Sequence, residues 1–568
     1  MPFESRDRTL PFRALVRGSL LLAAALVASA GPAARAADPI MPLAEVRAGM
    51  HCTGLSVIRG TEISSFDVEV LDVIAQETGL SGPRILVRAS GPAVDESGIG
   101  QGFSGSPILC DGRNAGALSE GIGDYGNNVV LATPIEEILG DRPARPTRAR
   151  GDSRLARAAR PLAGPLMVSG LSSRTRLLLT RAARRAGRTV LSAPAAPAGG
   201  YPPVDLRPGA SVAAAFSTGD VAIGGVGTVA YRDGESVWAF GHPLDGLGRR
   251  LLFLQDSYVF GVISNPLGLT DVGAMTYKLA SSAGHVLGSM TSDTVAAVGG
   301  VLGAEPPSIP LRVVGRHADG SVVTLESRLA DERSLGYGAG LSIVGPLAAG
   351  QAVERLMRSF GPVTLSMCTR FRVRELRRPM GFCNPYFDLD SALGHLANAG
   401  GMVDTFDLSP LHVESAEVRL RARPGVVEGV LVGADAPGRV RPGERIRARL
   451  VVQRRNGGRR RLSVPLRVPA SLQPGVRTLV FAGSGDSIGD GEIVIELAGA
   501  LFGISGDGGE GPEARSAREL ARAIRGLHRP LGIEARFRPR PARTVVRSDE
   551  VSYSGKVRLR LRVVRRGR

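Results

Sequence analysis

The second half of the chain alternates apolar and polar residues over short runs, which is the pattern of strands with one buried face. Such runs lie at residues 418–422, 446–450 and 462–468, and Asn456-Gly457 is a turn signal before the last of them. Evenly spaced short strands of this kind predict an immunoglobulin-like β-sandwich over residues 406–500.

Shorter apolar runs bounded by turn residues predict hairpins in the first half. One runs from Ile108 to Leu118 and a second from Val226 to Phe240. Helix signals are few and lie after Thr133-Pro134, at 349–360 and at 513–527. The last helix is expected to pack against the sandwich through its apolar stripe. The pattern therefore predicts a mainly β protein with a few short helices.

Composition supports this fold class. The 568 residues include 75 glycines and 38 prolines but only 4% aromatic residues, which favours turns and strands, and the length predicts three or four domains. We divide the chain into a signal peptide at 1–36, a serine-bearing β unit at 37–140, an Arg/Pro-rich linker at 141–161, a histidine-bearing β unit at 162–320, an α/β connecting region at 321–405, the sandwich at 406–500, and a C-terminal helix and strand at 501–568.

The N-terminus has the pattern of an export signal. Arginines precede an apolar run at Leu20–Val27, and Ala34-Arg35-Ala36 is a cleavage sequence that predicts a cut after Ala36. The apolar run is short for a membrane span. A secreted or extracytoplasmic protein is expected, with membrane association only through an uncleaved signal segment.

The net charge of +18 raises the question of a polyanionic partner. The basic residues are spread through strands and linker without interleaved aromatic residues, and lysine occurs only at Lys278 and Lys556. We interpret much of the arginine excess as a composition bias, and no nucleic-acid partner is expected.

The main chemical signal is Gln101-Gly102-Phe103-Ser104-Gly105-Ser106-Pro107, a serine on a glycine-flanked turn that leads into an apolar strand. Glycines on both sides permit a tight turn with positive φ, which would expose the Ser104 hydroxyl. The same turn would direct the amides of Gly102 and Ser104 to one point, as an oxyanion hole requires. A plain Gly/Ser turn is the alternative.

This motif resembles that of the SpoIVB-type S55 serine peptidases, in which the nucleophile lies in G-[MF]-S-G-S-P before a strand. Further segments resemble the family in the same order, and together they span roughly half of the expected mature chain. They are Gly49-Met50 to Leu55, Gly60-Thr61-Glu62, Phe66 to Val70, Gly116-Ala117, Ala132 to Glu136, Gly227-Thr228-Val229, Ala239 to Pro243 and Lys278 to Gly288.

The resemblance implies a histidine base, and His242 is the best candidate among seven histidines. It follows the second strand of a predicted hairpin, between Gly241 and Pro243, and a strand end can direct a side chain into a cleft. His285 ranks lower because no strand end orients it. His51 lies only about fifty residues before Ser104, which is too few for the two barrels that such a site normally spans. The others are interpreted as surface or packing residues: His317, His395, His412 and His528.

The third member of the expected triad departs from the family pattern. The position that should carry the orienting aspartate, about fifteen residues before the serine, is Ala89. Asp95 is the candidate that we name, with Asp220, Asp256 or a serine–histidine dyad as alternatives.

In this chain the serine half precedes the histidine half, so the resemblance implies a trypsin-like double β-barrel assembled in permuted order. The predicted function is an exported serine endopeptidase that cleaves protein or peptide substrates by acyl transfer through Ser104 and His242. The alternative is a non-catalytic secreted pseudopeptidase that acts as a binding or scaffold protein.

No metal or cofactor is expected, because the four cysteines lack C-x-x-C spacing and clustered histidines. Export permits disulfides, and the even count suggests Cys52 with Cys110 and Cys368 with Cys383, although the sequence does not fix the pairing.

Overall fold

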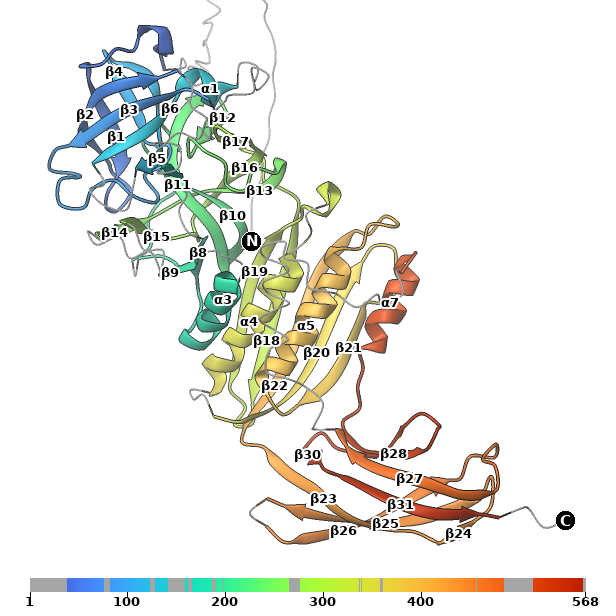
Figure 1. Ribbon diagram of the computed structural model, residues 1–568. Coiled ribbons are helices and arrows are strands. Elements are labelled where there is room, and N and C mark those ends of the chain that lie inside the picture. Colours follow the sequence, from blue (N-terminus) through green and yellow to red (C-terminus); the bar gives the residue numbers. More distant parts are fainter. Residues whose placement is uncertain are drawn as a thin grey trace, which may run out of the picture. The chain divides into compact units, whose positions relative to one another are not determined.

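The structure is a computed structural model that describes residues 38–564 apart from 76–81, 123–127, 141–158, 162–165, 186–189, 198, 265–275, 337, 339, 358–360, 456 and 485–513 (Figure 1). The expected signal peptide and most of the expected linker lie outside these residues. The protein is mainly β, as the pattern predicts. None of the described helices combines the length and the apolar character needed to cross a membrane.

The first strands form a closed six-stranded barrel. Its order is β4-β1-β2-β3-β6-β5, and β4 also pairs with β5. The barrel is filled by apolar residues that include Phe66, Val87 and Phe103. Its strands are β1 (His51–Val57), β2 (Ile63–Ile74), β3 (Arg84–Ser90), β4 (Pro107–Cys110), β5 (Arg113–Ile122) and β6 (Val129–Pro134). They are preceded by η1 (Leu43–Glu45) and followed by α1 (Ile135–Leu139), and β7 (Ala159–Pro161) pairs with β5.

A second group of six strands also pairs in a ring. Because β10 pairs with both β11 and β13, the order β10-β13-β16-β17-β12-β11 returns to its start. Leu252, Met290 and Val298 lie in the core of this ring. The strands are β10 (Ser211–Gly219), β11 (Ala222–Asp233), β12 (Ser236–Ala239), β13 (Gly248–Asp256), β16 (Val286–Asp293) and β17 (Val298–Leu302), with β14 (Val259–Ile263) and β15 (Tyr277–Ala280) as a separate pair.

The ring is part of a 13-stranded sheet that continues through β19, β18, β22, β20 and β21 on one side and β8 and β9 on the other. These strands are β8 (Leu166–Ser169), β9 (Val190–Ala193), β18 (Ser308–His317), β19 (Val322–Ala330), β20 (Val363–Val373), β21 (Met380–Tyr386) and β22 (Val413–Pro424). The accompanying helices are α3 (Ser173–Arg185), η2 (Arg333–Leu335), α4 (Gly340–Met357), α5 (Leu389–Asp404) and α7 (Ala517–Gly526).

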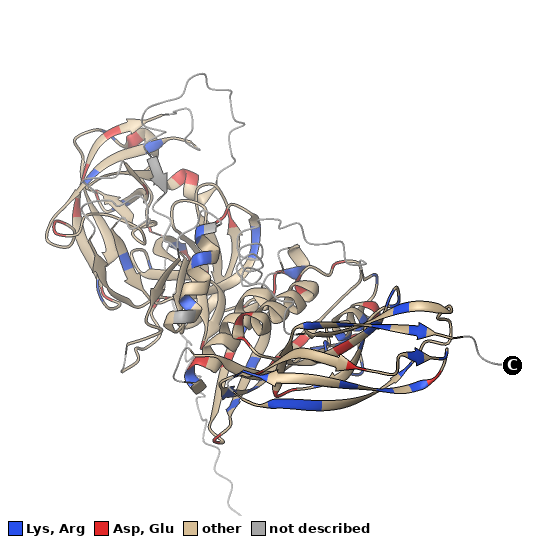
Figure 2. Ribbon diagram, turned by 60° about the horizontal axis from the view of Figure 1, so that its bottom comes forward, with Lys and Arg blue, Asp and Glu red and all other residues tan. Residues whose placement is uncertain are grey.

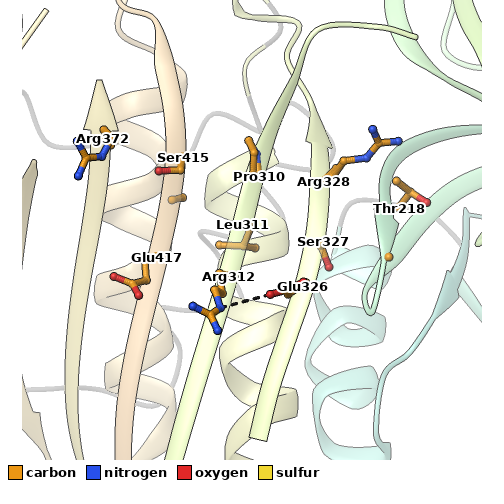
Figure 3. Close-up of a pocket in the computed structure, with 12 residues that line it drawn as sticks. Thr218, Pro310, Leu311, Arg312, Glu326, Ser327, Arg328, Arg372, Ser415 and Glu417 are labelled. Atoms are coloured by element: carbon orange, nitrogen blue, oxygen red, sulfur yellow. Dashed lines mark ion pairs between the residues drawn. The ribbon is translucent and has the colours of Figure 1, made fainter. Parts of the chain in front are cut away.

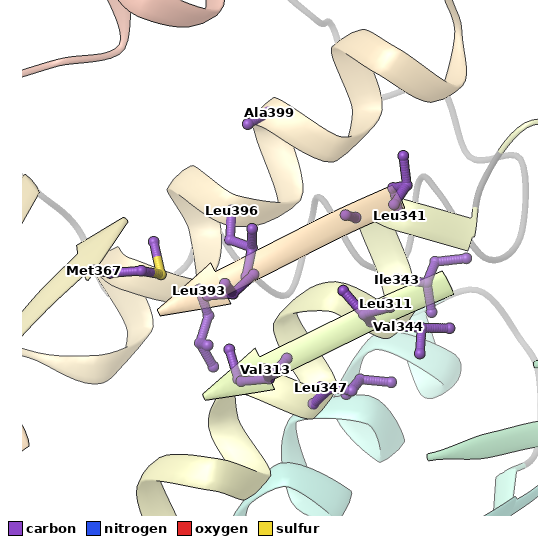
Figure 4. Packing of buried hydrophobic residues seen from close by; sticks show 14 of the residues in the cluster. Leu311, Val313, Leu341, Ile343, Val344, Leu347, Met367, Leu393, Leu396 and Ala399 are labelled. Carbon is purple, nitrogen blue, oxygen red and sulfur yellow. The ribbon is translucent and has the colours of Figure 1, made fainter. Parts of the chain in front are cut away.

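Helices α4 and α5 cover one face of β18, β20 and β22. Leu311 and Val313 of β18 share a core with Leu347 of α4 and Leu396 of α5 (Figure 4). Helix α7 adds Leu520, Ala521 and Ile524 to this same core, so the prediction that it packs against the sandwich is wrong. Its apolar stripe gave the correct buried face but carried no information about the partner.

The C-terminal strands form two sheets that share one core. Their orders are β26-β25-β23-β30 and β24-β31-β27-β28-β29, with Leu450, Phe481 and Leu561 among the buried residues. The strands are β23 (Val427–Asp435), β24 (Arg439–Val440), β25 (Arg445–Arg454), β26 (Arg459–Arg467), β27 (Gly475–Gly483), β28 (Gly532–Phe537), β29 (Arg543–Arg547), β30 (Val551–Ser554) and β31 (Lys556–Val563). The run at 418–422 belongs instead to β22, which pairs with β18 and β20.

Candidate active site

Ser104 lies in the turn that leads into β4 of the first barrel. Gly102 and Gly105 on either side have φ of +90° and +89°, the left-handed region that glycine tolerates. A Cβ atom at Gly105 would lie 2.0 Å from the carbonyl oxygen of Thr228 and 2.5 Å from the amide nitrogen of Phe240. Glycine is therefore required here by close backbone contact with the second strand group as well as by φ.

Several polar groups of this turn have no partner among the described residues. The side chain of Ser104 is fully buried, and its Oγ forms no hydrogen bond to any described residue. The amides of Gly102 and Ser104 likewise donate to no acceptor in the part of the chain that the structure describes. Buried polar groups normally have partners, so their concentration in one turn marks a place where a ligand could supply them.

His242 lies directly after the strained end of β12. Phe240 has φ of +71°, which is unusual for an aromatic residue, and Gly241 follows with +67°. A Cβ at Gly227 would lie only 2.3 Å from the Phe240 ring, so Gly227 leaves the space that this ring fills. The backbone is thus bent directly before His242.

The His242 imidazole is 2% exposed and has a defined tautomer. Its Nδ1 lies 2.7 Å from the carbonyl oxygen of Pro243, which can only accept, so Nδ1 carries the proton. Nε2 is then a lone-pair acceptor, and it is buried without a partner among the described residues. Burial lowers the pKa of His242, although the Pro243 carbonyl and the charge of Glu120 act in the opposite direction.

The serine turn and the histidine turn are in contact. A Cβ atom at Gly105 would lie 2.5 Å from the Phe240 amide nitrogen. A neighbouring strand also holds each turn, because the Thr228 amide donates to the Ser104 carbonyl at 2.8 Å and the Thr133 hydroxyl donates to the Gly241 carbonyl at 2.7 Å. No hydrogen bond joins Ser104 to His242 themselves. The fold therefore places the turn that carries the proposed nucleophile beside the turn that carries the proposed base, and the imidazole is in the neutral state that a base needs.

None of the carboxylates considered from the sequence contacts His242. Asp95 is exposed, and its Oδ1 accepts from the Gly91 amide at 2.8 Å. Asp220 accepts from the Glu326 amide at 2.8 Å. Asp256 is buried and pairs with Nδ1 of His285 at 2.8 Å. The group that orients His242 is the carbonyl of the next residue.

A buried ion pair near His242 was not predicted from the sequence. Glu120 on β5 accepts from Nε and Nη2 of Arg84 on β3 at 2.8–3.1 Å, and the two side chains are 9% and 3% exposed. Against the larger lowering effect of burial, the charge of Glu120 raises the pKa of His242. A glutamate inside the apolar run of residues 115–122 was the available signal, because a charge in a buried strand needs a partner.

Asp293, at the end of β16, fixes the turn after the histidine. Its carboxylate accepts from the amides of Leu244, Asp245 and Gly246 at 2.7–2.8 Å. Burial and a hydrogen bond with the Asp245 side chain raise the pKa of Asp293 to about 6. The backbone that follows His242 is therefore anchored to a neighbouring strand.

Lys278 on β15 lies beneath the serine turn. Its Nζ donates to Ser56 Oγ at 2.7 Å and to Thr228 Oγ1 at 3.1 Å, and it lies 4.6 Å from the centroid of the Phe103 ring. The side chain is 1% exposed, forms no ion pair within the described residues, and burial lowers its pKa to about 7. A buried lysine without a carboxylate is rare outside functional sites.

The two hydroxyl groups that Lys278 contacts are themselves hydrogen-bonded to the serine motif. Thr228 Oγ1 donates to the Gly102 carbonyl at 3.0 Å, and Ser56 Oγ lies 2.9 Å from Ser106 Oγ. In addition, the Lys278 amide donates to the Gln101 carbonyl at 2.9 Å. Lys278 thus contacts the turn on both sides of Ser104, a role that the sequence reasoning did not assign.

A separate cavity lies on the open face of the 13-stranded sheet (Figure 3). It has a volume of about 700 Å³ and is lined by strands β10, β18, β19, β20 and β22. Its charges largely pair, as in Arg312 with Glu326 at 3.3 Å. Arg372 also lines the cavity and forms no ion pair with a described residue, and no histidine or serine–histidine pair lies there.

Both suggested cysteine pairs are joined in the structure, Cys52–Cys110 within the first barrel and Cys368–Cys383 between β20 and β21. No group of histidine, cysteine and carboxylate side chains suited to a metal occurs among the described residues. Comparison with known proteins gave no matching family model, curated protein or solved structure. The likeness to S55 peptidases therefore depends on the sequence motifs alone.

Proposed function

We propose that the protein is an exported serine endopeptidase of the S55 type. In this proposal the closed barrel and the strand ring are the two halves of a trypsin-like double barrel in permuted order, and the C-terminal two-sheet unit is an immunoglobulin-like accessory domain. The observation that carries the proposal is the contact between two turns that hold a serine hydroxyl, an imidazole nitrogen and two amides, all buried and without a partner in the described part of the chain.

The reaction would begin with attack of Ser104 Oγ on the carbonyl carbon of a peptide bond, as its proton passes to Nε2 of His242. The amides of Gly102 and Ser104 would donate to the oxyanion. The amine then leaves with the proton from His242, and water, deprotonated by the same nitrogen, releases the acid from Ser104.

The orienting group in this mechanism is the Pro243 carbonyl. It keeps the proton on Nδ1, which is the tautomer that an aspartate would select. A neutral carbonyl stabilises the imidazolium less than a carboxylate does, so a slower enzyme than a full triad is expected.

Lys278 is a positioning residue in this proposal. It reaches the serine turn through Ser56 and Thr228 without contacting Ser104 Oγ, and its hydrogen bonds would keep the Gly102 peptide in the orientation that the oxyanion hole requires.

Burial of the site favours a second function. Ser104 is fully buried and His242 is 2% exposed, so a substrate carbonyl reaches the hydroxyl only after covering residues move. A pseudopeptidase that keeps the fold as a binding or scaffold protein needs no such movement.

Labelling of the mature protein with a fluorophosphonate probe separates the two functions. The enzyme predicts labelling that Ser104→Ala and His242→Ala abolish. Ser90→Ala and His285→Ala, which alter an exposed serine of the same barrel and a histidine that has a carboxylate partner, should retain it. Because the His242 pKa is lowered, labelling should persist below pH 6.5, the ordinary value for histidine. Absence of labelling in folded protein, with peptide present to induce opening, supports the scaffold function.

A further inference from the structure

The positive charge of the chain is concentrated in the C-terminal two-sheet unit. Residues 427–483 and 532–563 contain 21 Lys and Arg but only 6 Asp and Glu, whereas the whole chain has 71 and 53. Figure 2 shows basic residues along several strands of this unit. The basic residues are spread through strands and linker, as described from the sequence, but in this unit few acids accompany them. A bias for arginine over lysine explains the choice of cation but not the shortage of acids.

One sheet carries a row of cations on its outer face. Lys556, Arg558, Arg560 and Arg562 of β31 are exposed and alternate with apolar residues that face the core. Alternate residues of a strand are about 6.8 Å apart, so the row repeats at that spacing. None of the four forms an ion pair with a described residue. We call these four residues the β31 row.

The other sheet carries a second row. Arg445, Arg447 and Arg449 of β25 are exposed on its outer face, and we call them the β25 row. Arg445 lies directly opposite Arg467 of β26, so two like charges are cross-strand neighbours. Such pairs destabilise a sheet. Asp435 of β23 lies opposite Arg449, but no ion pair joins the β25 row to a described carboxylate. The two rows lie on opposite faces of one core.

The open face of the 13-stranded sheet provides a contrast within the same chain. There Arg312 pairs with Glu326, Arg328 with Glu305 and Arg419 with Glu417. Arg316, Arg372 and Arg421 on these strands form no ion pair with a described residue, so the face is balanced in part, whereas none of the four cations of the β31 row has an acidic partner among the described residues.

We propose that the two rows bind a flexible linear polymer that carries phosphate groups. Arginine forms paired hydrogen bonds with phosphate, and regularly spaced cations suit a polymer with regularly spaced anions. Charges on two opposite faces cannot both meet one planar bilayer, but a flexible chain can pass over both.

The aromatic residues of the unit disfavour nucleic acid as this polymer. Phe481, Phe537 and Tyr553 are its aromatic residues, and all three are buried in the core. Neither face thus offers a stacking platform for bases, which single strands require. A DNA duplex is stiff over about 150 base pairs and would contact one face only.

The test uses full-length Ser104→Ala protein, so its outcome does not depend on the proposed peptidase activity. Binding of long-chain linear polyphosphate is measured at several salt concentrations. Arg558→Gln/Arg560→Gln/Arg562→Gln removes most of the β31 row, and Arg445→Gln/Arg447→Gln/Arg449→Gln removes the β25 row. The matched control is Arg312→Gln/Arg328→Gln/Arg419→Gln on the open sheet face.

Each row variant should weaken binding by about tenfold or more and reduce the slope of log K against log salt by roughly 2, while the control binds as before. Equal weakening by the control, or unchanged binding by both row variants, overturns the proposal. If the protein binds phosphatidylglycerol vesicles and only one row variant weakens that binding, the partner is a bilayer. If it binds duplex DNA more tightly than polyphosphate at equal phosphate concentration, the partner is nucleic acid. Either result also overturns the proposal.

Discussion

Replacement of Lys278 by methionine should change how stability depends on pH. In the unfolded chain the amine keeps its proton up to about pH 10.5, but in the folded protein the pKa is about 7. Between these values the unfolded state binds more protons, so stability rises with pH, and below pH 7 the full cost of burying the charge is present. A difference of about 3.5 pH units corresponds to about 5 kcal/mol.

Lys278→Met removes this cost together with two hydrogen bonds of about 1 kcal/mol each. The variant should therefore be more stable than its parent by about 3 kcal/mol at pH 6 and about equally stable at pH 9. Both proteins carry Ser104→Ala, so self-cleavage cannot contribute.

The assay is unfolding by guanidinium chloride, followed by tryptophan fluorescence. Trp238 is the only tryptophan and lies on β12, in the strand ring whose β11 carries the Thr228 partner of Lys278. Lys556→Met on the exposed β31 row is the control, and it should show no pH-dependent difference. The reasoning is refuted if the free energy of unfolding of Lys278→Met differs from that of its parent by the same amount at every pH.

A direct measurement is also possible because the chain has only two lysines. Protein with ¹³C-labelled lysine gives two ε-carbon signals, and Lys556→Arg assigns the remaining one to Lys278. The Lys278 signal should titrate near pH 7. A midpoint near 10 would mean that the ammonium is solvated and not buried.

Three further changes test other contacts of the site. Asp293→Ala should lower stability by about 3 kcal/mol and slow labelling of Ser104, because three amides after His242 lose a charged acceptor, and calorimetry with a labelling time course measures both. Gly105→Ala should cost about 3 kcal/mol or more, since its Cβ would overlap backbone atoms of Thr228 and Phe240, whereas Gly112→Ala, with positive φ but open space, should cost about 1 kcal/mol. Equal losses in denaturant titrations would contradict the contact. Removal of Cys52–Cys110, which closes 58 residues, should lower the thermal midpoint more than removal of Cys368–Cys383, which closes 15, and the reverse order would argue against a loop-entropy cause.

Local signals in the sequence predicted the local features of the site. The glycines around Ser104 predicted positive φ, and the hairpin ending at Gly241 placed His242 at a bend, because both depend on neighbouring residues only. The alternating runs predicted strands for the same reason.

What the sequence could not give was pairing between distant elements. The run at 418–422 is a strand, but its partners are β18 and β20 and not the sandwich. Lys278 is one lysine in an apolar run until Thr228 and Ser56 come within hydrogen-bond distance. Alternation and spacing describe which face a residue takes, and they carry no information about what lies against that face.

The serine turn depends on residues that come much later in the chain. Ser104 lies in the first barrel, but Thr228 and Lys278 belong to later strands and His242 follows another, β12. A chain that crosses a membrane from its N-terminus delivers the nucleophile first and its base and support last. Under the proposed function, a partly exported chain would be inert, and proteolysis would begin only after both halves had arrived and folded together.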